Sequence, residues 1–143
     1  MDDKVKIAID AMGGENAPTK IINWIEISLK ENNENFFYLY GDSSLLKSEV
    51  SKTTLLKENC EIIHTKDIIL DDASPLEAAK KGKQSSMWKA VESLKEKTAH
   101  ICLSAGNTGA LLVISRLILK TIDGISKPAL AALWPNQNSM NVV

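Results

Sequence analysis

Short apolar runs that alternate with helical patterns are the feature that most constrains the fold of this chain. Residues 5–9 alternate apolar and polar side chains at strand spacing, and residues 36–40 form a continuous apolar and aromatic run. Between them, apolar residues from Ile21 to Leu29 recur at helical spacing. A strand–helix–strand order implies right-handed crossovers and parallel strands, and an unbroken apolar run is typical of a strand covered on both faces. The sequence therefore predicts an α/β fold with a mostly parallel sheet.

The alternation continues to the last residue. Further helices are predicted over residues 43–57, as two short pieces, and over 110–120. Another helix is predicted to begin at Ser74 and to be interrupted at Gly82, and a new one begins near Ser85. Further strands are predicted at 60–64, 101–103, 129–134 and 140–143. Pro18 and Pro75 suit first helical positions, and Ser74 with Glu77 fits a capping box. Because the final residues look like the first half of a strand, we expect residues 1–143 to be the N-terminal part of a single α/β domain, cut inside a strand.

Composition excludes several classes of protein. The 143 residues carry 17 basic and 18 acidic side chains, and this balance argues against a protein that binds nucleic acid or an anionic membrane over most of its surface. A hydrophobic share of 44% is enough for a core and argues against disorder. Apolar runs are far shorter than the ~20 residues of a membrane-spanning helix, and the N-terminus has no signal-peptide pattern. With Cys60 and Cys102 interpreted as buried free thiols, the sequence predicts a cytoplasmic protein in a reducing compartment.

The loop Ser104-Ala105-Gly106-Asn107-Thr108-Gly109-Ala110 is the most specific candidate site. It follows a predicted strand and opens a predicted helix. Gly106 and Gly109 allow a tight turn, and free N–H groups with the helix dipole favour an anion at such a position. Asn107 and Thr108 add side-chain donors. The spacing fits a plain strand-to-helix turn equally well, and it matches neither of the common nucleotide-binding fingerprints.

A second glycine loop follows the first predicted strand. Gly13 and Gly14 lie between Asp10 and Pro18, again at the carboxyl end of a strand. Ligands of open parallel sheets bind at those ends, so both loops are expected to face one crevice. Asp10 there would bind a hydroxyl, a cation or a lysine, or would only hydrogen-bond its own turn. Judged from its own turn alone, Asp10 is expected only to hydrogen-bond that turn. The shared location of the two loops favours a ligand-binding role for it.

A lysine-rich segment precedes the helix predicted from residue 85. Lys80, Lys81 and Lys83 lie just before Ser85 and Ser86, which can cap that helix. Such a cluster attracts phosphate or an acidic partner, although a solvated helix end is the commoner explanation.

The remaining reactive or large side chains are interpreted as structural. His64 and His100 have no carboxylate or cysteine cluster beside them, no metal-ligand spacing is present, and the three tryptophans fit core or interface positions. Of the basic residues only Arg116 is arginine, which excludes an arginine-lined anion site.

Four motifs in order resemble one known family. These are residues 9–14 with 16–18, the Ser-Ser-Met of 85–87, residues 104–111, and 124–125 with 127–130. Together they resemble the bacterial phosphate acyltransferases of phospholipid synthesis, the PlsX family, over about residues 5–134 and well under half of the family's length. Gly82 departs from a usually basic position, and Lys80, Lys81 and Lys127 stand where arginine is common.

The resemblance implies transfer of a fatty acyl group from acyl carrier protein to inorganic phosphate. The product is acyl phosphate, and its formation is the first step toward phosphatidic acid. A glycerol-3-phosphate acyltransferase then uses acyl phosphate as its substrate. The implied fold is a Rossmann-like α/β/α sandwich similar to the phosphotransacetylase and isocitrate dehydrogenase class, incomplete in this chain. The resemblance implies a homodimer that uses no metal, nucleotide or other cofactor. It also implies peripheral contact with the inner face of the membrane, through parts of the protein beyond this chain.

The resemblance also assigns roles to residues. The catalytic set is Asn107 and Thr108, with Asp10 as a site organiser. The phosphate- or substrate-binding set is Gly13, Gly14, Lys83, Ser85, Ser86, Ser104, Gly106 and Gly109. Lys80 and Lys81 are expected to dock the acidic carrier protein. Two alternatives stay open: a phosphate acetyl- or butyryltransferase that uses coenzyme A, and an inactive structural fragment of such an enzyme.

Overall fold

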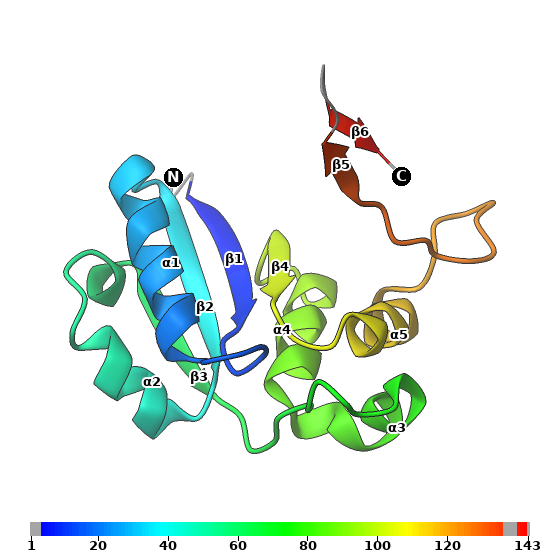
Figure 1. Ribbon diagram of the computed structural model, residues 1–143, viewed down its shortest axis with the longest axis horizontal. Coiled ribbons are helices and arrows are strands. Elements are labelled where there is room, and N and C mark those ends of the chain that lie inside the picture. The colour runs from blue at the N-terminus through cyan, green and yellow to red at the C-terminus, as the bar shows by residue number, and fades with distance from the viewer. Residues whose placement is uncertain (1–3, 136–139, 143) are drawn as a thin grey trace.

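A four-stranded parallel sheet forms the centre of the protein. The computed structural model describes residues 4–135 and 140–142. The strands are β1 (Val5–Asp10), β2 (Asn35–Gly41), β3 (Cys60–His64) and β4 (Ile101–Ser104), in the order β3-β2-β1-β4 (Figure 1). Asp10 is level with Tyr40 on one side and Ser104 on the other. The predicted α/β class and parallel sheet are confirmed.

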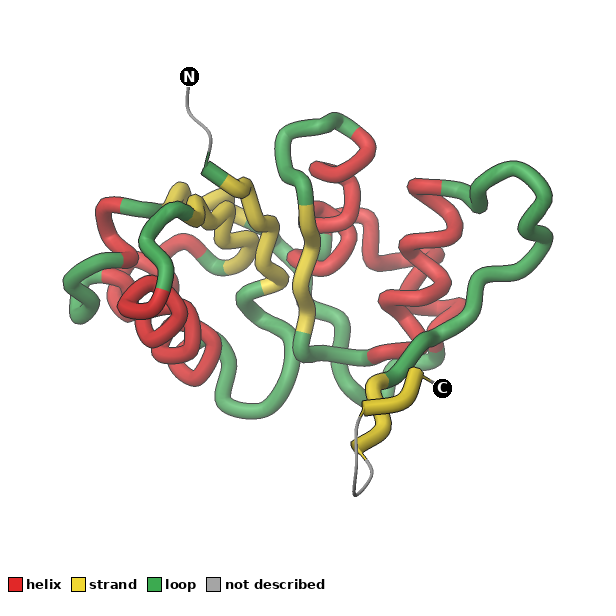
Figure 2. Tube along the Cα trace, turned by 90° about the horizontal axis from the view of Figure 1, so that it is seen from above, coloured by secondary structure: helices red, strands yellow, loops and turns green. Residues whose placement is uncertain are grey.

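Helices cover both faces of this sheet. They are α1 (Thr19–Glu31), α2 (Ser43–Val50), α3 (Pro75–Lys81), α4 (Ser86–Lys95) and α5 (Thr108–Leu119), with short 3₁₀ turns η1 (Leu56–Glu58) and η2 (Gly82–Gln84). Figure 2 shows α1 and α2 on one side of the strands and α4 with α5 on the other. Helix α4 packs on β1, β2 and β4, and α3 and α5 pack beside each other. The arrangement is the predicted α/β/α sandwich, and the region 43–57 does fold as two short pieces.

The alternation of β1 divides the core into two halves. Ile7 and Ile9 pack with the apolar stripe of α1, including Ile22 and Leu29. Ala8 points to the other face, where it joins a cluster with α4. Successive strand residues point to opposite faces, so Asp10 lies on the same face as Ala8. The carboxylate at the end of β1 is thereby directed toward the start of α4.

Several predicted helix starts differ from the observed ones. Pro18 occupies the N-cap position, one residue before α1, whereas Pro75 does begin α3. The hydroxyl of Ser74 makes no capping hydrogen bond, so the predicted capping box is wrong. Helix α5 begins at Thr108 rather than at residue 110, because Asn107 caps it. Gly109 is therefore part of the first helical turn and not of the loop.

The end of the chain departs most from the prediction. Strand β5 (Leu133–Pro135) covers only the end of the predicted strand 129–134. It pairs antiparallel with β6 (Met140–Val142), as a hairpin that stands apart from the parallel sheet (Figure 1). Val143 lies outside the described residues.

The reactive side chains set apart as structural have ordinary environments. His64 Nδ1 accepts the Ser43 N–H at 3.3 Å, and His100 Nδ1 accepts the Lys6 N–H at 3.1 Å, so both histidines are structural. Both cysteines are free thiols that are only partly buried, and not fully as predicted. Burial raises the pKa of Cys60 to about 11.

Burial perturbs the second thiol, and one of the tryptophans is exposed. Cys102 has a pKa of about 12, raised by burial and then by nearby Asp10. Trp24 is 53% exposed, with Lys20 Nζ 5.1 Å from its ring centre, so it is no core residue. Trp88 packs against the cluster of α4 and α5, and Trp134 falls in β5, its side chain outside the described set. Among the described helices, none has the length and apolar character needed to cross a membrane.

Glu26 joins α1 to the turn before β3, and its removal is expected to destabilise the fold. Its carboxylate accepts the N–H groups of Thr54, Leu55 and Leu56 at 2.9–3.2 Å. Desolvation alone raises the pKa of Glu26, but the three N–H groups and Lys30 together lower it below its usual value. We expect Glu26→Ala to lower the free energy of unfolding by about 1–2 kcal/mol at pH 7.

Because the pKa is lowered in the folded state, this contribution is present at neutral pH and disappears as the pH falls through the folded-state pKa. Urea unfolding at pH 7 and pH 3 checks the expected convergence of the wild type and the variant. Glu31→Ala, an exposed change in the same helix, is the matched control, and an equal loss in both variants would contradict the assignment.

Candidate functional site

The two glycine loops meet backbone to backbone at the carboxyl ends of β1 and β4. A Cβ on Gly106 would lie 3.1 Å from the Gly13 Cα, and a Cβ on Gly14 would lie 2.6 Å from the Ala105 carbonyl oxygen. Gly14 also has a φ of +91°, which favours glycine. The expected shared location of the loops is thus confirmed.

A buried hydrogen-bond chain ties the loops together. The Ser104 hydroxyl donates to Asp10 Oδ2 at 2.7 Å and accepts the Gly106 N–H at 3.1 Å. Asp10 is only 1% exposed, and burial raises its pKa, although the hydrogen bond from the Ser104 hydroxyl opposes this rise. Asp10 Oδ1 and Ser86 Oγ have no hydrogen-bond partner within residues 4–135 and 140–142. Asp10 therefore lies beneath the loops and is shielded from solvent.

The raised pKa of Asp10 has a measurable consequence. The folded state binds the Asp10 proton more tightly than the unfolded state, so this group makes the free energy of unfolding decrease as the pH rises through the interval between the two pKa values. Asp10→Asn removes that dependence. We expect the free energy of unfolding of the variant to rise relative to that of the wild type as the pH increases from 4 to 8, measured by urea unfolding at matched ionic strength. A gain by the wild type over the same range would show that the folded-state pKa is lowered instead.

Asn107 connects the start of α5 to the preceding turn. Its Oδ1 accepts the Ala110 N–H at 2.9 Å, which caps the helix. Its Nδ2 donates to the carbonyl oxygens of Asp71 and Ala73, both at 2.9 Å. The side chain predicted to donate to substrate is thus already engaged, and it fixes the turn at residues 70–73. Nothing in the sequence motif indicated these carbonyl acceptors, which lie more than 30 positions away.

The first helical turn of α5 presents the groups best suited to an anion. Thr108 is exposed, while Ala110 and Leu111 donate to Asn107. The first N–H groups of a helix have no intrahelical acceptor, and no hydrogen bond to the N–H of Thr108 or Gly109 occurs among the described residues. A Cβ on Gly109 would lie 2.8 Å from Pro75 Cγ, so α3 closes one side of this turn.

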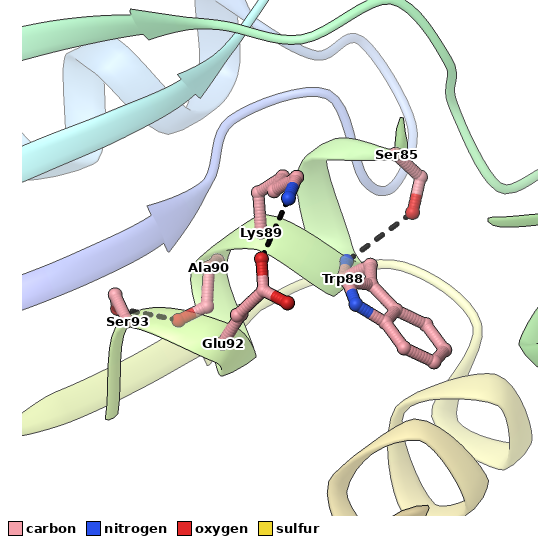
Figure 3. A network of polar contacts seen from close by, with 6 residues as sticks. All are labelled: Ser85, Trp88, Lys89, Ala90, Glu92 and Ser93. Carbon is pink, nitrogen blue, oxygen red and sulfur yellow. Dashed lines mark hydrogen bonds and ion pairs between the residues drawn. The ribbon is translucent and has the colours of Figure 1, made fainter. Parts of the chain in front are cut away.

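The serine pair at the start of α4 lies behind the loops. Figure 3 shows the Ser85 hydroxyl, which accepts the Trp88 N–H at 3.2 Å and caps α4 as predicted. Both Ser85 and Ser86 are fully buried. A Cβ on Gly106 would lie 3.4 Å from Met87 Cε, so α4 supports the loop from below. Direct contact between these serines and a phosphate stays a prediction.

The lysines of the basic segment all lie on the surface. Lys80 and Lys81 belong to α3, and Lys83 belongs to η2. Lys81 Nζ is 3.7 Å from a Glu77 carboxylate oxygen, one exposed helical turn away. These cations are accessible to an acidic partner, and that role also stays a prediction.

Comparison with known proteins identifies the family. The profile described as "Fatty acid synthesis protein" matches residues 5–143. A protein named "Phosphate acyltransferase" from Pelagibacter ubique (strain HTCC1062) is 52% identical over the whole chain, which covers 42% of that relative. Proteins of the same name from Rhodopseudomonas palustris (strain HaA2) and Xanthobacter autotrophicus are 41% and 39% identical over the whole chain, which covers 41% and 40% of them. The chain thus spans about two fifths of the length of these relatives. Its match to the profile and these identities show that it belongs to the family described as "Fatty acid synthesis protein".

Proposed function

We propose that the protein containing this chain transfers an acyl group from a thioester to inorganic phosphate. The observation that carries the proposal is the junction of the two glycine loops, which places the first turn of α5 beside the Asp10–Ser104 pair. The names of the relatives support the same reaction class. The donor we propose is acyl carrier protein, and the product is acyl phosphate for phospholipid synthesis.

The reaction needs no covalent enzyme intermediate. A phosphate oxygen attacks the thioester carbonyl carbon, a C–O bond forms, the C–S bond breaks, and the thiolate leaves and takes up a proton. The N–H groups of Thr108 and Gly109 and the Thr108 hydroxyl suit either the phosphate or the oxyanion that develops at the carbonyl. We assign Asn107 to positioning, because its amide holds the turn at 70–73 against the helix start. Asp10 is also a positioning residue, because its hydrogen bond with Ser104 holds the loop that precedes α5.

The partners follow from the same proposal. Lys80, Lys81 and Lys83 are exposed cations that suit an acidic carrier protein. A glycerol-3-phosphate acyltransferase would consume the acyl phosphate. A cytoplasmic location with peripheral membrane contact and a homodimeric state remain part of the proposal.

An assay on an extended chain tests the function. The 143 residues are joined to the C-terminal remainder of the Pelagibacter ubique relative, and acyl phosphate is trapped as hydroxamate after incubation with dodecanoyl-acyl carrier protein and phosphate. We expect product from the extended chain and none from the 143 residues alone. The absence of product from the extended chain, with the full-length relative active in parallel, would reject the proposal for this chain.

The coenzyme A alternative is separated in the same assay. Acetyl-, butyryl- and dodecanoyl-coenzyme A are compared with the carrier-protein thioester at equal concentration. Higher kcat/KM with a short-chain coenzyme A thioester would assign the chain to a phosphate acetyl- or butyryltransferase instead.

A further inference from the structure

A groove along α5 carries only positive charge. It has a volume of about 690 Å³, and its ionisable lining residues are Arg116, Lys120 and Lys127. No carboxylate lines it within the described ranges, and none of the three cations forms an ion pair there. Apolar walls come from Leu76 and Leu112, among others. An elongated anion with an apolar middle section would match this combination of charge and surface.

The groove begins one helical turn beyond the candidate site and extends past the end of α5. Leu112 and Arg116 line the groove, Thr108 lies one turn before them, and Lys120 is the C-cap residue that follows the helix. These four positions recur at intervals of four and form a stripe that winds gradually around α5. At about 1.5 Å per residue, the stripe is roughly 18 Å long. Pro75 closes the first turn of α5 and the next residue, Leu76, lines the groove, so the upper end of the groove adjoins that turn.

The donor proposed above has the matching dimensions. Carrier proteins and coenzyme A both present their acyl group on a phosphopantetheine arm. Thirteen bonds separate its phosphorus from its sulfur, and at about 1.2 Å of advance per bond the extended arm is roughly 16 Å long. With the thioester at the N–H groups of Thr108 and Gly109, the phosphate would reach the cations at the far end of the stripe.

We infer that this groove binds the phosphopantetheine arm, with Arg116, Lys120 and Lys127 holding its phosphate. The inference rests on the proposed function and names the donor's binding site. Arg116 offers a planar fork of donors suited to phosphate, and the two lysines add charge around it. The apolar walls accommodate the dimethyl and methylene groups of the arm. The sole arginine of the chain thereby acquires a role that the four family-like motifs did not include.

Binding to the 143-residue chain tests the inference without turnover. Calorimetric titrations compare 4′-phosphopantetheine with pantetheine, which lacks the phosphate. We expect the phosphate to improve the affinity of the wild type by at least tenfold. The triple variant Arg116→Gln, Lys120→Gln, Lys127→Gln is expected to reduce that preference below twofold. The matched control Lys47→Gln, Lys57→Gln, Lys95→Gln removes three exposed charges from other elements and should keep the preference.

Two results overturn the inference. One is equal affinity, or no measurable affinity, of the wild type for the two compounds. The other is a phosphate preference that survives in the triple variant while circular dichroism shows both variants folded.

Kinetics of the extended chain separate this inference from the proposed function. The triple variant should raise KM for dodecanoyl-phosphopantetheine and leave that for dodecanoyl-pantetheine unchanged. The carrier-protein and coenzyme A thioesters show which source of the arm is used. If no donor yields acyl phosphate while the binding preference depends on the three cations, the proposed function fails and the arm site stands. If acyl phosphate forms with the same KM in the triple variant and the wild type, the arm site fails alone.

Discussion

Asn107→Ala in the extended chain is expected to lower acyl-phosphate formation by about 100-fold, the scale seen when a preorganised donor site is disrupted. The substitution removes the cap of α5 and both amide contacts to the turn at 70–73. The N–H groups of the first turn then lose their fixed direction. Loss of the cap alone costs about 1 kcal/mol of stability, so the protein is expected to stay folded.

Asn107→Asp separates the two functions of the side chain. Aspartate still accepts the Ala110 N–H, yet it cannot donate to the carbonyl oxygens of Asp71 and Ala73. We expect this variant to keep the thermal stability of the helix start and to lose most of the activity. Initial rates with dodecanoyl-acyl carrier protein and unfolding curves measure both effects.

Thr108→Ala completes the series at the helix start. If the double variant of Asn107 and Thr108 stayed within threefold of the wild type, a change of only ~0.65 kcal/mol at the transition state, the assignment of this turn to catalysis would be wrong.

Gly13→Ala is expected to abolish activity and to lower stability by about 1–3 kcal/mol. A Cβ at this position would lie 2.5 Å from Asp10 Oδ2 and 3.0 Å from the Gly106 nitrogen. Backbone and a buried carboxylate surround it, so the two loops must move apart. Separation of the loops also stretches the Ser104–Asp10 hydrogen bond.

The control for Gly13 is Gly124→Ala. Gly124 has a φ of +84°, so alanine is strained there, but a Cβ would meet no atom within 4 Å. Gly13 has no positive φ, so an equal loss of activity in the two variants would contradict the contact between the loops as the cause. Hydroxamate assays and chemical unfolding on both variants provide the comparison.

Periodicity predicted the sheet because each element has a local signature. The alternation in β1 and the unbroken apolar run of β2 arise from burial of one or both faces, and burial leaves a pattern in neighbouring residues. The loops were located for the same reason, since Gly13 and Gly106 lie within three residues of the ends of β1 and β4. Their contact could be anticipated, because the ends of parallel strands share one edge of a sheet.

The features that could not be predicted depend on distant partners. Asn107 has the sequence of an ordinary helix cap, and only the fold brings the carbonyl oxygens of residues 71 and 73 to its amide. Ser74 has the sequence of a capping box, but its hydroxyl does not cap α3. The residues 129–132 have strand-like composition without a neighbouring strand, and they form none. In each case tertiary geometry decided between options that the local sequence left equal.

The hydrogen bond between Ser104 and Asp10 joins residues 94 positions apart. Contacts at such separation require closure of a long loop before any favourable interaction forms, and chains dominated by them fold slowly. β1 lies between β2 and β4, so its second edge stays open until β4 has been synthesised and docked. The glycine junction consequently requires β4 to be docked, and we expect it to form later in folding than the pairing of β1 with β2.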